Sequence, residues 1–518
     1  MLKRPLAFRG GIRLAHHKYE SAHSPIASAP LPERLILPLR QSAGRAPEPI
    51  VREGDRVKKG DRIAAAEEWI SASLHAPTSG TVRAIGPFPV AHPSGLSAPA
   101  IVIEADGADE WGEKTPLLDS PARSAANRAA LSPEETQRFL QNMGVVGLGG
   151  AVFPSHVKLS RAPNTPLQTL IINGAECEPF ITCDDRLMRE RADDVISGTL
   201  FLRDLLEVKE TLIAVENNKP EAADALRAAL ARADAAREIR DVAVMELPAI
   251  YPAGSIKQLI FALTGKRAPA HVLPTALGVQ CFNAATVYCV WRAVAHGEPV
   301  THRVVTLTGN VEHPGNMEVP LGMPMGQLLA LARPRPETDA CIVGGPMMGF
   351  LLTDERAPVV KGSNCLIARS DAFFPPLEPE TSCIRCTSCA QVCPQGLQPY
   401  ELYWWSRAKN SEKAARYQLM ECIECGCCAY VCPAHIPLVQ YFRFAKGEVR
   451  AAEKAQDMAA RAKERFEFRQ LRAEREKAER AEKLARAAAL QAEKLALAAV
   501  TDTDSPANAQ TPTTENAP

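Results

Sequence analysis

Two runs of closely spaced cysteines constrain the fold of this chain more than any other feature. Each run follows the pattern C-x2-C-x2-C-x3-C-P, and the cysteines are Cys383, Cys386, Cys389 and Cys393 in the first run and Cys422, Cys425, Cys428 and Cys432 in the second. Three thiolates spaced two residues apart can hold one face of an iron–sulfur cubane from a single loop, while the fourth points toward a second cluster. We therefore predict two [4Fe–4S] clusters in one small domain, with Cys432 completing the first set of three and Cys393 completing the second.

Structural zinc and disulfide bonds are the alternatives for so many cysteines. A zinc site takes two CxxC pairs and has no use for a third cysteine at the same spacing or for the prolines that close each run, Pro394 and Pro433. The chain has 15 cysteines, an odd number, and is much longer than small secreted disulfide-rich proteins. The spacing favours clusters over zinc, and the extra Cys427 is expected to be a packed thiol.

The composition predicts several domains and excludes some classes of partner. With 518 residues, 46% of them apolar, the chain can bury more than one core. Its 60 basic and 60 acidic residues leave no net charge, so we expect no long-range attraction to nucleic acid. The chain has no apolar run of ~18 residues or more and no apolar core of a signal peptide near its start, so we expect a cytoplasmic protein without a membrane span.

After an N-terminal segment, residues 1–30, we predict a small β domain over residues 31–105. The phrases VREGDRVKKGDRI and LHAPTSGTVRAI indicate short strands joined by Gly-Asp turns. They resemble the barrel-sandwich fold of lipoyl and biotinyl carrier domains, but residues 64–68 read AAAEE where the carrier lysine is expected. We therefore expect this scaffold without its swinging arm, followed by a linker over residues 106–131.

Residues 132–302 are predicted to form an α/β domain. Ser132, Pro133 and Glu135 predict the start of a helix that runs to about Met143. The chain then alternates between strands and helices, with strands at 169–173, 211–216 and 242–247 and helices near 184–206 and 220–237. This order predicts a parallel sheet whose ligands lie beyond the carboxyl ends of its strands.

Four further segments follow the α/β domain. Residues 303–370 contain a hairpin and a helix start and resemble the β-grasp module found beside flavin domains. Residues 371–445 hold the cysteine runs in an α-helical ferredoxin-type domain. Residues 446–500 are rich in Ala, Glu, Lys and Arg and predict a long charged helix, for which a docking role and a plain solvated face both stay open. Residues 501–518 are expected to be disordered.

Two loops of the α/β domain carry the candidate binding residues. Gly147 and Gly149, followed by Lys158, could bring backbone amides close to a phosphate and place an ammonium beside it. This loop follows a predicted helix, whereas a Rossmann loop follows a strand, so a plain structural turn is the alternative. A second loop, at the end of the first strand of the sheet, contains three further polar residues, Asn173, Glu176 and Glu178. The alternative for the acids of this loop is the start of the next helix, where Asp184 and Asp185 already suit the dipole without any ligand.

Together these motifs resemble the C subunit of the Rnf ion-translocating electron transport complex, which is related to the flavin- and NADH-binding subunit of respiratory complex I. The resemblance covers nearly everything from residue 5 to about residue 445 and includes YPAGSIKQ at 251–258 and NAAT at 283–286. It implies FMN as a cofactor and assigns roles to five residues: the FMN phosphate is held by Gly147, Gly149 and Lys158, and the flavin and its ribityl chain are approached by Asn173 and Glu176.

The resemblance also implies an electron-transferring oxidoreductase of the ferredoxin:NAD+ type within a translocase. NAD(H) would be the substrate, in contact with Glu178. The partners would be the other subunits of the membrane complex and a ferredoxin-like electron carrier. The protein would lie at the cytoplasmic face of the bacterial inner membrane as a peripheral protein, with no span of its own.

Two alternatives remain open at this point. A related soluble cobalamin reductase shares the glycine loop and the paired cluster motifs. A flavin-free iron–sulfur relay, serving as a scaffold that supports reduction of a redox regulator, is the other. The sequence departs from the family pattern at Arg13, Val152, Ile256 and Ala285, and valine or alanine in place of glycine adds bulk where a cofactor approaches. Flavin content distinguishes the relay from the full electron path, and the long charged helix after Lys446 argues mildly against the soluble reductase.

Overall fold

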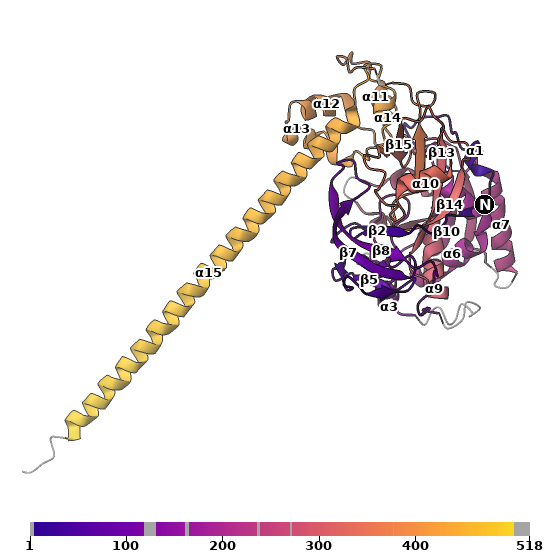
Figure 1. Cartoon of the computed structure of the whole chain (residues 1–518). Coiled ribbons are helices and arrows are strands. Elements are labelled where there is room, and N and C mark those ends of the chain that lie inside the picture. The colour runs from indigo at the N-terminus through magenta and orange to yellow at the C-terminus, as the bar shows by residue number, and fades with distance from the viewer. Residues whose placement is uncertain are drawn as a thin grey trace, which may run out of the picture. The chain divides into compact units, whose positions relative to one another are not determined.

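The computed structural model describes residues 5–118, 131–160, 165–235, 239–269, 272–376 and 378–501, with side chains up to Ala498 (Figure 1). Most of the predicted linker, residues 119–130, and the predicted tail beyond Thr501 lie outside these residues. The chain divides into two compact units, Met1–Arg443 and Phe444–Pro518.

The first unit begins with two small antiparallel sheets in the predicted barrel-sandwich region. One sheet has the strand order β2 (Arg34–Pro38), β8 (Ser97–Ala105), β7 (Gly80–Pro89), β4 (Arg56–Val57), and the other has the order β3 (Glu48–Pro49), β5 (Arg62–Ala65), β6 (Leu74–His75). Alternate residues of the paired strands β2 and β8 are apolar and point to one face. Leu35, Leu37, Ile101 and Ile103 are therefore fully buried.

A four-stranded parallel sheet forms the centre of the first unit. Its strand order is β11 (Val242–Leu247), β10 (Glu210–Glu216), β9 (Thr169–Gly174), β12 (Val279–Asn283). The sequence predicted β9, β10 and β11 but missed β12. Because β9 lies between β10 and β12, the chain leaves β9 toward one edge of the sheet and later returns on the other side. Open parallel sheets bind their ligands at such a reversal, beyond the carboxyl ends of the strands.

Helices connect the strands of this sheet and precede it. They are α3 (Pro133–Asn142), α4 (Ser155–Lys158), α5 (Cys183–Glu190), α6 (Ala192–Leu206), α7 (Pro220–Asp234), α8 (Ile256–Thr264) and α9 (Ala284–His296). Ser132 Oγ accepts the backbone N–H of Glu135 at 3.0 Å, which confirms the predicted cap of α3. The helix predicted near 184–206 is divided into α5 and α6 because the backbone of Arg191 leaves helical geometry. The sequence did not predict α9.

A mixed six-stranded sheet follows, in the predicted β-grasp region. Its order is β1 (Ala27–Ser28), β14 (Gly315–Pro320), β13 (His302–Gly309), β17 (Cys365–Arg369), β15 (Ala340–Val343), β16 (Phe350–Leu351), and α10 (Met325–Leu331) follows the predicted β13–β14 hairpin. The edge strand β1 comes from the N-terminal segment, which also contains α1 (Tyr19–Ala22). The N-terminal segment is therefore part of this sheet, which its sequence did not predict.

Short helices surround the cysteine runs, as expected for a ferredoxin-type domain. They are α11 (Ser388–Gln391), α12 (Pro399–Arg407), α13 (Ser411–Arg416) and α14 (Cys427–Tyr430). The last helix, α15 (Leu438–Thr501), has 64 residues and begins earlier than the charge pattern predicted. Its residues from 450 to 498 are all exposed, as the predicted charged helix requires. No helix in the described ranges combines the length and the apolar character needed to cross a bilayer.

Candidate functional site

The reversal of the central sheet is the floor of the main candidate pocket. Asn173 near the end of β9 and Asn283 at the end of β12 are partners in the strand register, so both lie at this edge. The pocket here has a volume of about 350 Å³, within the usual range for small-molecule sites. All six residues predicted to bind FMN or NAD(H) line this one pocket, namely Gly147, Gly149, Lys158, Asn173, Glu176 and Glu178.

The glycine loop between α3 and α4 is held in shape by its own backbone. Gly147 donates its N–H to Phe153 O at 2.8 Å, and Val152 donates to Gly147 O at 3.1 Å. Gly150 has φ +100°, which a glycine adopts without strain. Val152 has φ +43°, a conformation that a β-branched residue rarely adopts. Val152, which the resemblance marked as a departure, is therefore also a strained position of the loop.

Lys158, at the end of α4, supplies a cation to the same pocket. Its ammonium donates to the carbonyl oxygen of Cys281 in β12 at 3.1 Å. Burial lowers the pKa of Lys158, because no carboxylate among the described residues lies beside the ammonium to offset the loss of water. An anionic group in the pocket would stabilise this charge.

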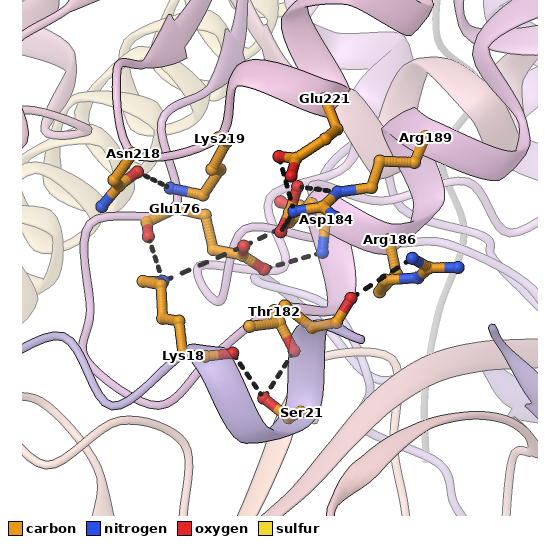
Figure 2. A network of polar contacts seen from close by, with 12 residues as sticks. Lys18, Ser21, Glu176, Thr182, Asp184, Arg186, Arg189, Asn218, Lys219 and Glu221 are labelled. Carbon is orange, nitrogen blue, oxygen red and sulfur yellow. Dashed lines mark hydrogen bonds and ion pairs between the residues drawn. The ribbon is translucent and has the colours of Figure 1, made fainter. Parts of the chain in front are cut away.

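The acidic loop after β9 belongs to a buried network of charges (Figure 2). Glu176 accepts the backbone N–H groups of Asp184 at 2.7 Å and Asp185 at 3.2 Å, so its carboxylate caps the N-terminus of α5. The ammonium of Lys18 donates to the backbone oxygen of Glu176 at 2.8 Å and lies 4.0 Å from its carboxylate. Burial nevertheless raises the pKa of Glu176 to about 7.

Two asparagines fix the floor of the pocket. Asn173 donates from Nδ2 to Gly254 O at 2.9 Å and accepts the N–H of Ala175 at 3.1 Å. Asn283 donates from Nδ2 to the carboxylate of Asp184 at 2.5 Å. The sequence had singled out Asn173 but given no role to Asp184 beyond the helix dipole, and the contact with Asn283 depends on a strand that was not predicted.

Part of the pocket lining comes from the β-grasp and cluster domains, with Met348 from the first and Cys425 from the second. The carboxylate of Glu178 accepts the N–H of Met347, in the loop between β15 and β16, at 3.1 Å. Tyr251 donates its hydroxyl to the backbone oxygen of Cys425 at 2.7 Å, and Cys425 itself lines the pocket. Burial raises the pKa of Glu178 to about 7. One cluster loop therefore borders the space that the glycine loop encloses.

The cysteines of the two runs surround two separate small cavities. One is lined by Cys383, Cys386, Cys389 and Cys432. The other is lined by Cys393, Cys422, Cys425 and Cys428, together with the extra thiol of Cys427. The two cavities thus contain the crossed sets that the spacing predicted, while the assignment of each thiol as a ligand stays a prediction.

The residues that line the pocket suit FMN, and those that line the two cysteine cavities suit [4Fe–4S] clusters. Gly149 of the glycine loop lines the pocket, and its N–H has no partner among the described residues. The ammonium of Lys158 lines the same pocket. A free N–H and a cation both suit a phosphate. Four thiols around a small cavity suit a [4Fe–4S] cluster, whose iron atoms bind cysteine thiolates.

Sequence reasoning missed several residues that shape this site. Lys18 comes from the N-terminal segment, and Lys219 donates to Ala175 O in the acidic loop at 2.7 Å from the start of α7. Arg303 of β13 and Thr286 of α9 hold the glycine loop from behind. Thr286 belongs to the NAAT segment of the resemblance but had no role assigned to it, and no local motif marks the other three, which reach the site only through the tertiary fold.

Comparison with protein families finds four matches in the order of the domains described above. They are the RnfC barrel sandwich hybrid domain over residues 6–108, the Nuo51 FMN-binding domain over 140–292, the SLBB domain over 304–351 and the 4Fe-4S dicluster domain over 382–436. The cofactors expected from the sequence, FMN and [4Fe–4S] clusters, are those that the matched domains bind.

Curated relatives resemble nearly the whole chain. The C subunit of an ion-translocating oxidoreductase complex from Haemophilus influenzae is 43% identical over 467 residues, which are 90% of this chain and 68% of the relative. The protein of the same description from Pasteurella multocida is 45% identical over 461 residues, and the chain spans only 53% of its length. A solved NAD+-reducing [NiFe]-hydrogenase matches 64% of each chain with a TM-score of 0.46 and 18% identity, too low a likeness to inform the site. With identity above 40% over nine-tenths of its length, the chain belongs to the family of the C subunits of ion-translocating oxidoreductase complexes.

Proposed function

We propose that this protein passes electrons between NAD(H), FMN and two [4Fe–4S] clusters, as a peripheral subunit of a membrane-bound complex of the ferredoxin:NAD+ oxidoreductase type. One observation carries the proposal: Cys425 and the glycine loop line the same pocket. A flavin in that pocket lies next to a cluster. FMN supplies the exchange between two-electron hydride transfer and the one-electron steps of the clusters.

The chain's own residues have distinct tasks in this proposal. Gly147, Gly149 and Lys158 hold the FMN phosphate: Gly149 offers an N–H with no partner among the described residues, Lys158 offers a cation, and Gly147, whose N–H is bound to Phe153 O, keeps the loop in shape. Asn173 and Glu176 orient the flavin and its ribityl chain from the floor. Glu178 is placed to contact the nicotinamide nucleotide.

The exposure of the cysteines supports an order for the two clusters. The cluster of Cys425 borders the flavin pocket and receives electrons first. The second cluster includes Cys386, which is exposed, whereas Cys389 of the same set is buried. An exposed ligand suits exchange with a partner protein, so we propose that electrons pass there to or from a ferredoxin-like carrier or another subunit of the complex.

The name of the relatives supports a place in a membrane complex, and the proposal puts the chain on its cytoplasmic face. The flavin-free relay remains the second candidate because Val152 replaces the family glycine with strained backbone in the phosphate loop. Flavin content decides between the two.

The test uses anaerobically purified full-length protein. The proposal expects about eight irons, one FMN, and bleaching of both clusters by NADH. In Cys425→Ala, NADH is expected to reduce the flavin while the remaining cluster stays oxidised. In the matched variant Cys386→Ala, NADH is expected to reduce both the flavin and the remaining cluster. The opposite pattern in the two variants refutes the order of the clusters, and wild-type protein without FMN refutes the flavin path.

A further inference from the structure

Arg303 is a buried cation that contacts the glycine loop without lining the pocket itself. It belongs to β13 of the β-grasp sheet, and only 4% of it is exposed. Its Nη2 donates to the backbone oxygen of Leu148 at 2.6 Å, and its Nε donates to the backbone oxygen of Ser363 at 2.9 Å. The third nitrogen, Nη1, is buried without a hydrogen-bond partner among the described residues.

The contact with Leu148 fixes the direction of one peptide group in the loop. In a trans peptide the C=O and the following N–H point in opposite directions. Because Arg303 holds the Leu148 carbonyl on its own side, the N–H of Gly149 points away from Arg303. Gly149 lines the flavin pocket, and this N–H has no partner in the described chain.

A second contact holds the preceding peptide group, that between Gly147 and Leu148. The N–H of Leu148 donates to Thr286 Oγ1 at 2.8 Å, so both polar groups of Leu148 are bound outside the pocket. The buried carboxylate of Asp184 lines a small cavity together with Arg303 but is hydrogen-bonded to Asn283. Arg303 therefore has no direct ion pair among the described residues, and its charge stays available to a nearby anion.

We propose that Arg303 is a positioning residue for the phosphate of FMN, an inference that rests on the flavin site proposed above. It turns the Leu148–Gly149 peptide so that the Gly149 N–H donates to the phosphate. Its buried charge, behind the loop, adds to the attraction that Lys158 provides from the front. Arg303 therefore makes binding depend on the phosphate group rather than on the flavin ring.

The test compares two ligands that differ only in that phosphate. Full-length protein with clusters assembled and flavin removed is titrated with FMN and with riboflavin, and each Kd is measured by quenching of flavin fluorescence. Wild-type protein is expected to bind FMN more tightly than riboflavin. Arg303→Met is expected to lower this preference by about 10-fold to 100-fold, the usual effect of losing one charge-assisted contact, and to leave the Kd for riboflavin within about twofold.

Two further variants complete the experiment. Arg191→Met removes the 2.9 Å ion pair between Arg191 and Glu318, which also joins the α/β domain to the β-grasp sheet. Because Arg191 does not line the pocket, this variant is expected to keep the wild-type preference for FMN over riboflavin. Arg303→Lys keeps the buried charge but cannot bridge the carbonyls of Leu148 and Ser363. It is expected to lose about threefold or more of the preference, and it serves as the test if the methionine variant does not fold.

The outcomes separate the inference from the proposed function. Equal weakening of FMN and riboflavin in Arg303→Met means that Arg303 only supports the shape of the pocket, and this overturns the inference while the flavin site stands. A wild-type preference in folded Arg303→Lys also overturns it. Wild-type protein that binds neither flavin, or both equally well, refutes the phosphate site itself.

Discussion

Replacing Gly10 by alanine should disturb the iron–sulfur domain, although Gly10 precedes the affected cysteine by more than 380 residues in the sequence. Gly10 has φ +71° and packs against the end of the first cysteine run. A Cβ at this position would lie 2.7 Å from three backbone atoms, the carbonyl oxygen of Val392 and the carbonyl carbon and oxygen of Cys393. Backbone atoms cannot move aside as the end of a flexible side chain can, so Cys393 must shift.

The size of the effect follows from two separate contributions. The left-handed conformation costs an L-residue about 1–2 kcal/mol. Forcing extra volume into a packed site costs about 1–3 kcal/mol more. Gly54 isolates the first contribution, because it has φ +93° and nothing lies within 4 Å of its added Cβ. Gly10→Ala should therefore cost about 2–5 kcal/mol and Gly54→Ala about 1–2 kcal/mol.

The assay is the iron content and the denaturant midpoint of the cluster absorbance, measured without oxygen. Gly10→Ala is expected to lose iron toward about four per chain, because Cys393 is the predicted fourth ligand of the cluster held by the second run. Gly54→Ala is expected to keep about eight irons and to show only a small shift of the midpoint. Equal midpoints and equal iron contents in the two variants would refute the claim that the N-terminal segment supports this cluster.

Three further predictions concern the clusters, a buried acid and the strained loop. Cys432→Ala and Cys393→Ala should each lower the iron content toward about four per chain, and EPR spectra should show that a different cluster remains in each variant. Loss of iron in Cys427→Ala would contradict the predicted ligand sets. Burial raises the pKa of Glu178 to about 7 from 4.5, so between these pH values the folded protein holds a proton that the unfolded chain has lost. The free energy of unfolding should therefore fall by on the order of 3 kcal/mol from pH 4.5 to pH 7. The denaturant midpoint of Glu178→Gln should lack this fall. If the midpoints of wild type and variant change with pH in parallel, the prediction is contradicted. Val152→Gly should raise the denaturant midpoint, because the relief of about 1–3 kcal/mol of backbone strain exceeds the cost of losing a half-buried side chain. A lower midpoint would show that the packing of the Val152 side chain matters more than its strain.

The elements that the sequence predicted well are those with strong local signals. The cap of α3 depends on Ser132 and Glu135, which lie three residues apart, and the strands β9, β10 and β11 are apolar runs bounded by polar turns. The cysteine spacing likewise defines two cavities with the predicted crossed sets. In each case the residues that determine the structure are close together in the chain.

The elements that were missed depend on distant contacts. β12 reads VQCFN, a short segment with two polar residues, and it becomes a strand because it pairs with β9 in the register that joins Asn283 to Asn173. The strand β1 has only two residues and exists because β14 offers an open edge. Short segments carry little pattern, so pairing partners decide their structure.

The candidate site shows the same division. Glycines and acids in the two loops were recognisable from their local pattern and from the family resemblance. Lys18, Lys219 and Arg303 were not, because a single basic residue in a strand, a turn or an N-terminal segment is usually a solvated charge. Their burial beside the loops is what makes them part of the site.

The N-terminal segment explains how three modules can share one pocket. Its backbone reaches each of them through hydrogen bonds, from Leu6 to Ala262, from Gly11 to Val392, from Ile12 to Tyr251 and from Phe180 to His16. Its strand β1 then joins the β-grasp sheet, and Lys18 enters the acidic loop. A flavin site and a cluster on separate domains could drift apart, since interfaces between domains are often small and polar. A segment that hydrogen-bonds to the α/β domain, the cluster loop and the β-grasp sheet ties the three together, which the proposed passage of electrons from the pocket to the cluster of Cys425 requires.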